Sequence, residues 1–136
     1  MTHLKKFGLA VIRDRKLLLC KPFAYNDLIV PGGIIEGDET AEENLTREVI
    51  EELGALCSIR ANSLKYVGEF TDAAAGKTDR LVTVFLYRAE LDGEMFASSE
   101  IKELIWFGAG VDENPSAVVK NKIIPFFIKQ GELDAI

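Results

Sequence analysis

The pattern of apolar and polar positions divides the chain into short, alternating elements. Apolar runs at residues 7–12 and 16–21 are joined by Arg13, Asp14 and Arg15, which predicts two strands with a hairpin-like turn. Pro125 is expected to kink or restart a helix near the end of the chain. The other predicted elements are strands at residues 58–70, 81–91 and 104–107, a loop, TDAAAGKTD, between the first two of these, and the final helix at residues 117–129. Together they indicate an α/β fold, with a mixed β-sheet covered by helices on its faces.

The clearest helical pattern lies in the middle of the chain. Its apolar positions recur every four residues and form a core-facing stripe: Ala41, Leu45, Val49 and Leu53. Gly37, Asp38 and Thr40 give the helix a polar start, where acidic residues also suit the helix dipole. Gly54 can adopt a positive φ and is expected to end the helix.

Three carboxylates of this helix share one face beside the stripe. Glu48, Glu51 and Glu52 are three and four residues apart or adjacent, so their side chains gather within about one turn. Like charges this close repel each other, which indicates a cation between them. Hard oxygen ligands without a nearby His or Cys favour Mg²⁺ or Mn²⁺ over zinc. The alternative is an ordinary solvated acidic face, which explains neither the neighbouring glycines nor Arg47.

The run GIIEGDETAEENLTREVIEELGA, residues 33–55, resembles the Nudix box. The charged and glycine positions of the box are all present: Gly33, Glu39, Arg47, Glu48, Glu51, Glu52 and Gly54. Pro31 and Gly32 match the usual entry to the box, whereas its last position is Ala55 in place of a larger aliphatic residue. The segment EIKELIWF around Trp106 and the strand order resemble the family less specifically. The resemblance implies an α/β/α sandwich and a hydrolase that cleaves nucleoside diphosphates linked to another moiety.

The resemblance also implies roles for individual residues. The expected metal ligands are the carboxylates of Glu48, Glu51 and Glu52 and the backbone carbonyl of Gly32. Glu48 or Glu52 is expected to double as the base that takes a proton from water. Arg47 completes the expected catalytic set by orienting these carboxylates. Glu39 is expected to support the preceding loop or a more distant metal, and purely structural roles for Arg47 and Glu39 stay open.

Related enzymes often supply one more carboxylate from the segment before Trp106. Glu100 and Glu103 both lie there, and Glu103 is the preferred metal ligand because it is nearer the predicted strand. The alternative is that both are solvated surface residues.

Substrate contacts are expected from positions that can reach phosphate or nucleoside. Lys21 lies at a strand end, Lys77 and Arg80 flank the polar loop, and Gly33 permits close backbone approach to a ligand. An aromatic ring before the box and an amide on the final helix can reach a base. The predicted substrate-binding residues are Lys21, Gly33, Tyr25, Arg80 and Asn121.

Composition narrows the class of protein. The 136 residues are expected to form a single domain, residues 1–136. A net charge of −6 argues against a nucleic-acid polymer or an anionic membrane as partner and favours a small nucleotide. Because the N-terminal sequence lacks a signal-like apolar stretch, a cytoplasmic location is expected, and a homodimer is left open.

Cys20 and Cys57 are expected to be reduced core thiols, and His3 is expected in a frayed terminus and thus badly placed for catalysis.

Several functions remain open at this point. A metal-dependent hydrolase of a (d)NTP or modified nucleotide is favoured, with a nucleotide-sugar or dinucleotide pyrophosphatase as the alternative. A non-catalytic nucleotide-binding regulator would tolerate loss of the carboxylates, yet all of them are present. A diphosphate isomerase would need a well-placed Cys or His near the metal. The fold alone does not select the substrate.

Overall fold

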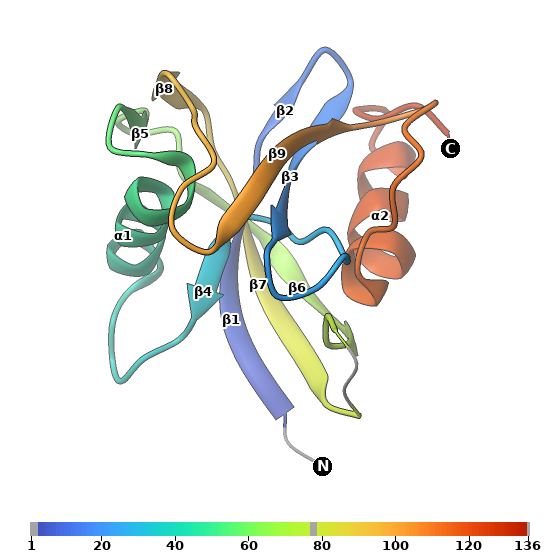
Figure 1. The fold of residues 1–136 in the computed structure, drawn as a ribbon, viewed down its shortest axis with the longest axis horizontal. Coiled ribbons are helices and arrows are strands. Elements are labelled where there is room, and N and C mark those ends of the chain that lie inside the picture. The colour runs from blue at the N-terminus through green and yellow to red at the C-terminus, as the bar shows by residue number, and fades with distance from the viewer. Residues whose placement is uncertain (1–2, 77–78, 136) are drawn as a thin grey trace.

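A computed structural model describes residues 3–76 and 79–135. Two helical segments enclose strands between them, one on each side (Figure 1). The elements in chain order are β1 His3–Ala10, β2 Ile12–Arg13, β3 Lys16–Pro22, β4 Gly32–Ile34, α1 Ala41–Leu53, β5 Cys57–Ile59, β6 Lys65–Ala73, β7 Leu81–Arg88, β8 Leu91–Gly93, β9 Ile101–Phe107, the π-helical segment η1 Val119–Ile123, and α2 Ile124–Lys129.

The strands form a mixed arrangement. In the four-stranded sheet the order is β4-β1-β7-β6, with β1 parallel to β7 and antiparallel to β4. A second sheet, β2-β3-β9, is antiparallel, and β5 pairs with β8. The predicted α/β sandwich with a mixed sheet is therefore confirmed.

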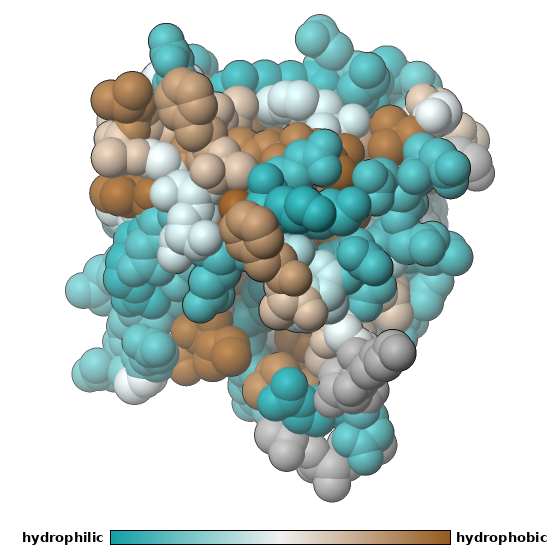
Figure 2. All heavy atoms as spheres, viewed as in Figure 1, coloured by the Kyte–Doolittle hydropathy of each residue, from teal (hydrophilic) through white to brown (hydrophobic). Residues whose placement is uncertain are grey.

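The apolar residues of strand β3 do not alternate with polar ones, and the position of the strand explains why. Leu17 and Leu19 belong to the core cluster that also contains Phe127 of α2. Leu18 and Cys20 point to the other cluster, which contains the buried stripe of α1. Both faces of the strand are buried between helical layers, so a continuous apolar run is required. On the outer surface, apolar side chains lie in separate groups among hydrophilic ones (Figure 2).

Helix α1 begins and ends as the sequence predicts. Thr40 caps its N-terminus and forms a capping box with Glu43. Gly54 follows the last helical residue with a φ of 95°. Leu45, Val49 and Leu53 are buried, and Ala41 is partly buried against the same cluster. The neighbouring face is therefore available for the carboxylates.

Several predicted strand boundaries are wrong. The run at residues 58–70 is interrupted between β5 and β6, where Asn62 takes a φ of 64°. The run at 81–91 splits into β7 and β8. The expected loop is shorter than predicted, because β6 continues to Ala73 and Thr71 pairs with Thr83, their hydroxyl oxygens 2.7 Å apart. Strand β9 starts at Ile101, three residues earlier than predicted.

The final helix changes geometry where Pro125 predicts. Residues 117–118 are α-helical, η1 is π-helical, and α2 starts at Ile124 with the proline in its first turn.

The two cysteines are free and buried, as predicted. His3 is not frayed: it belongs to β1, and its Nε2 lies 2.7 Å from the Thr83 hydroxyl. Within residues 3–76 and 79–135, no helix is long and apolar enough to cross a membrane.

Candidate active site

The carboxylates of Glu48, Glu51 and Glu52 lie in the last two turns of α1. The Glu48 side chain is only 16% exposed, whereas that of Glu51 is 51% exposed. Glu52 is partly buried. The helix thus holds two carboxylates inward and one at the surface.

The glycines of β4 lie directly against two of these carboxylates. The Gly32 N–H donates a 2.9 Å hydrogen bond to Glu52 Oε1. A Cβ atom on Gly33 would lie 2.5 Å from Glu48 Oε1. Gly32 itself has a φ of 140°, and a Cβ there would lie 2.1 Å from the carbonyl oxygen of Phe7 in β1. The double glycine lets the strand pass between β1 and the acidic face of α1.

A hydrogen-bonded group at the start of the helix positions Arg47. Its Nη1 donates to Glu39 Oε2 at 2.7 Å, and Asn44 Nδ2 donates to Glu39 Oε1, also at 2.7 Å. These two bonds are the main reason that the pKa of Glu39 is lowered to about 2. Arg47 Nη2 also lies 3.6 Å from Glu48 Oε1. This geometry suits the orienting role expected of Arg47, which stays a prediction.

Sequence reasoning missed Asn44. Its side chain is fully buried and donates to the Ile34 carbonyl at 3.2 Å as well as to Glu39. It therefore ties the segment after β4 to the helix. A polar residue one turn before Glu48, beside the apolar stripe, was the available signal.

Burial shifts the pKa values of the two inward carboxylates. Burial raises the pKa of Glu52 to about 7, against the opposing effects of the Gly32 N–H and Lys6. Burial, followed by the charge of Glu51, also raises the pKa of Glu48. Lys6 of β1, which sequence reasoning also missed, contributes positive charge to both groups. Its position depends on the pairing of β1 with β4, which the local sequence does not reveal.

The donor set fits a hard divalent cation. It offers carboxylate oxygens, the type of ligand that Mg²⁺ and Mn²⁺ prefer. In the described part of the chain, however, no three acidic, His or Cys side chains converge closely enough to hold a metal ion. The predicted ligands are therefore neighbours on one helix face without being fully assembled.

The structure does not bring Glu103 to this cluster. Glu103 is exposed and pairs across the strands with Lys21, whose Nζ lies 3.4 Å from Glu113 Oε2. Glu100 instead lines a hollow of about 470 Å³ together with Glu52. Glu100 is the other acidic residue of this segment. It lies just before β9, where the N–H groups of Phe96 and Ser98 donate to the carbonyls at the end of α1.

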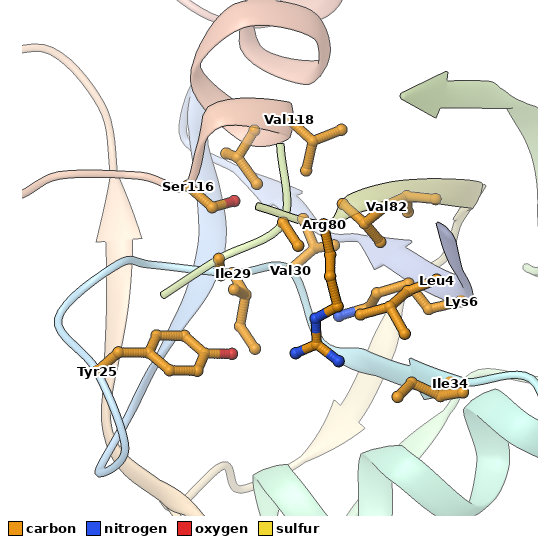
Figure 3. A pocket seen from close by; sticks show the side chains of 14 residues that line it. Leu4, Lys6, Tyr25, Ile29, Val30, Ile34, Arg80, Val82, Ser116 and Val118 are labelled. Carbon is orange, nitrogen blue, oxygen red and sulfur yellow. The ribbon is translucent and has the colours of Figure 1, made fainter. Parts of the chain in front are cut away.

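A second cavity, of about 210 Å³, lies between the four-stranded sheet and residues 116–119 (Figure 3). Tyr25 and Arg80, two of the predicted substrate-binding residues, line it. Asn121 is not among its lining residues and donates from Nδ2 to Asp72 Oδ2 at 3.1 Å. Lys77 lies outside the described residues. Ser116, which sequence reasoning did not single out, lines the cavity with its side chain buried.

The sequence of this chain is similar to those of known proteins. A family model described as the NUDIX domain matches residues 2–119. An ADP-ribose pyrophosphatase of Methanocaldococcus jannaschii is 27% identical over 99 residues, which cover 70% of this chain and 56% of that protein.

Solved structures share the fold. A UDP-X diphosphatase superposes with a TM-score of 0.70 at 21% identity, covering 96% of this chain and 64% of its own. A MutT NUDIX hydrolase from Burkholderia pseudomallei gives a TM-score of 0.68 at 21% identity, covering 96% of this chain and 98% of its own. The chain thus spans 56% of the pyrophosphatase and 64% of the diphosphatase.

Proposed function

This chain belongs to the Nudix family, and we propose that it is a metal-dependent hydrolase that cleaves a diphosphate bond in a nucleoside diphosphate-linked substrate. The substrate proposed first is a (d)NTP or a modified nucleotide, which is a small molecule and not a nucleic-acid polymer. The observation that carries the proposal is the contact of Glu48 and Glu52 with Gly32 and Gly33 of β4: Glu48 packs closely against Gly33, and Glu52 accepts a hydrogen bond from Gly32.

Each residue of the site has a part in the proposed reaction. Glu48, Glu51 and Glu52 would hold Mg²⁺ or Mn²⁺, with the Gly32 carbonyl as a further ligand. When bound, such an ion supplies charge neutralisation at the phosphate oxygens and lowers the pKa of a water. Glu48 or Glu52 accepts the proton of the attacking water at a carboxylate oxygen. Arg47, fixed by Glu39, limits the movement of Glu48.

A second substrate class is supported by one specific observation. The relative that is 27% identical over 99 residues is an ADP-ribose pyrophosphatase. A nucleoside diphosphate joined to a sugar presents the same diphosphate group to the carboxylates, so the chemistry would be unchanged. The two classes differ in what lies beyond the second phosphate.

The test is a substrate panel with the purified protein. The panel contains the (d)NTPs, ADP-ribose, a UDP-sugar and a dinucleotide polyphosphate, each with Mg²⁺, with Mn²⁺ and with a chelator. Products are identified by chromatography and ³¹P NMR. The expected result is metal-dependent release of a nucleoside monophosphate with pyrophosphate or with the second phosphorylated product.

Matched variants separate this enzyme from a contaminating activity. Glu52→Gln should abolish the hydrolysis, whereas Glu42→Gln, an exposed glutamate in the first turn of the same helix, should retain it. Absence of metal-dependent hydrolysis over the whole panel would contradict the proposal and favour a nucleotide-binding regulator.

A further inference from the structure

The 210 Å³ cavity has mostly aliphatic walls. Val30, Val82, Val84 and Val119 contribute to them, from the segment before β4, from β7 and from η1. Its polar side chains are few: Lys6, Tyr25, Arg80 and Ser116. In Figure 3 the Arg80 guanidinium group lies between the Tyr25 ring and Ile34. Mostly aliphatic walls with a few polar side chains suit a flat, weakly polar group.

Ser116 is an unusual residue in this wall. It is 2% exposed, and its Oγ has no hydrogen-bond partner among residues 3–76 and 79–135. Its backbone is fully used, because its N–H donates to the Leu28 carbonyl and its carbonyl accepts from the Lys120 N–H, both at 2.8 Å. A serine in this position before a helix normally turns its hydroxyl to cap the helix. A buried hydroxyl without a partner is costly, which indicates that a ligand supplies the missing partner.

The cavity is rich in donors. Lys6 and Arg80 can only donate, whereas the hydroxyls of Tyr25 and Ser116 can donate or accept. Burial, followed by the nearby Asp27 carboxylate, raises the pKa of the Tyr25 phenol, so its proton is retained. The lining side chains of the described residues include no carboxylate and no carboxamide. Among the described lining side chains, exocyclic amino groups of a base would find acceptors only in these two hydroxyls, whereas carbonyl oxygens would find donors in all four polar side chains.

The cavity also adjoins the carboxylates of α1. Tyr25 and Ile29 line both this cavity and the hollow that Glu52 lines, and Lys6 also lines the cavity. A nucleotide with its base in the cavity would thus direct its phosphates past Lys6 toward the acidic face of α1.

We propose that the cavity binds the base of the substrate, that it selects oxo bases such as uracil, thymine and hypoxanthine over the amino bases cytosine and adenine, and that the Ser116 hydroxyl donates to the base carbonyl. The inference rests on the proposed function in taking a nucleotide as the ligand. Ser116 is thereby a specificity-determining residue. It replaces Asn121, whose amide is bound to Asp72 instead.

Equilibrium binding of nucleoside monophosphates tests the selectivity without requiring hydrolysis. The two probe pairs, UMP with CMP and IMP with AMP, each differ by a carbonyl beside a ring N–H in place of an amino group beside an unprotonated ring nitrogen. Affinities are measured by NMR titration with wild type, Ser116→Ala, Ser116→Thr and the control Ser58→Ala, which lies exposed on β5. The oxo member of each pair should bind roughly 3- to 10-fold more tightly to wild type, the range expected for one hydrogen bond.

The variants assign that preference to the hydroxyl. Ser116→Ala should bring both ratios close to one with an unchanged or higher Tm, since it removes an unpartnered buried group. Ser116→Thr and Ser58→Ala should keep the ratios. A wild-type preference for CMP and AMP, or ratios that survive in Ser116→Ala, would overturn the inference. If the ratios depend on Ser116 while no compound of the substrate panel is hydrolysed, the proposed function fails and the base site stands.

Discussion

The N–H of Gly32 donates a 2.9 Å hydrogen bond to Oε1 of Glu52, so the first residue of β4 is joined to α1 at a carboxylate. The bond uses one carboxylate oxygen and leaves the other for chemistry. Because the donor is a backbone group, the position of Glu52 is independent of any other side chain's rotamer.

Replacing Glu52 by Gln should remove the negative charge of the side chain and keep its hydrogen bond with the Gly32 N–H. The amide oxygen can still accept from Gly32, so the fold should be retained. The loss of charge should lower kcat by at least about 100-fold under saturating Mg²⁺, because a charged ligand and candidate base is removed. Glu51→Gln should also lower turnover, and both variants should unfold at the same or a higher temperature than wild type without metal, since three close like charges become two. Near wild-type turnover in both variants would contradict the site assignment.

Gly33→Ala and Gly37→Ala should have opposite effects. A methyl group on Gly33 meets the Glu48 carboxylate at 2.5 Å, and the flexible end of that side chain can move away, so activity should fall by more than about tenfold with little loss of stability. Gly37 has nothing within 4 Å of an added Cβ but has a φ of 58°. Its alanine variant should lose about 1 kcal/mol of stability and keep its activity. Assays of kcat/KM and urea unfolding on both variants check the contrast.

The pairing of Glu39 with Arg47 and Asn44 should make stability pH-dependent. The pKa of Glu39 is lowered from 4.5 to about 2, so its stabilising effect is complete above about pH 4.5 and is lost as the pH falls toward 2. Glu39→Gln should therefore reduce the loss of stability in that window. Arg47→Gln should do the same, and the double variant should add little to either single one. Unfolding curves at pH 6, 4 and 3 measure this; additive effects would show that the pair is not coupled.

The sequence predicts the features that depend on residues close together in the chain, and it does not predict those that depend on residues far apart. Helix α1, its cap Thr40 and its terminal Gly54 are predictable because periodicity and capping are local. Lys6 and Ser116 are not, because they meet at the cavity only after β1 has paired with β7 and the final helix has packed on the sheet. The same limit applies to Glu103 and Glu100. The sequence analysis prefers Glu103 because it is nearer the predicted strand, but closeness in sequence does not show which glutamate lies beside Glu52 in the fold.

Tyr25 and Asn121 are both predicted from the sequence to bind substrate, but only Tyr25 lines the cavity. Tyr25 lines the space beside Arg80, so Tyr25→Ala should raise KM for the best nucleotide several-fold and leave kcat nearly unchanged, as expected for lost uniform binding. Asn121 lies outside the lining residues, and its amide is bound to Asp72 at 3.1 Å. Asn121→Ala should therefore leave both constants within about twofold and cost about 0.5–1 kcal/mol of stability, the value of one exposed hydrogen bond. Steady-state kinetics on the substrate found in the panel, with thermal unfolding of both variants, decide the matter. A raised KM in Asn121→Ala would place the base against the Asn121 side chain, outside the cavity, and move the recognition surface away from Ser116.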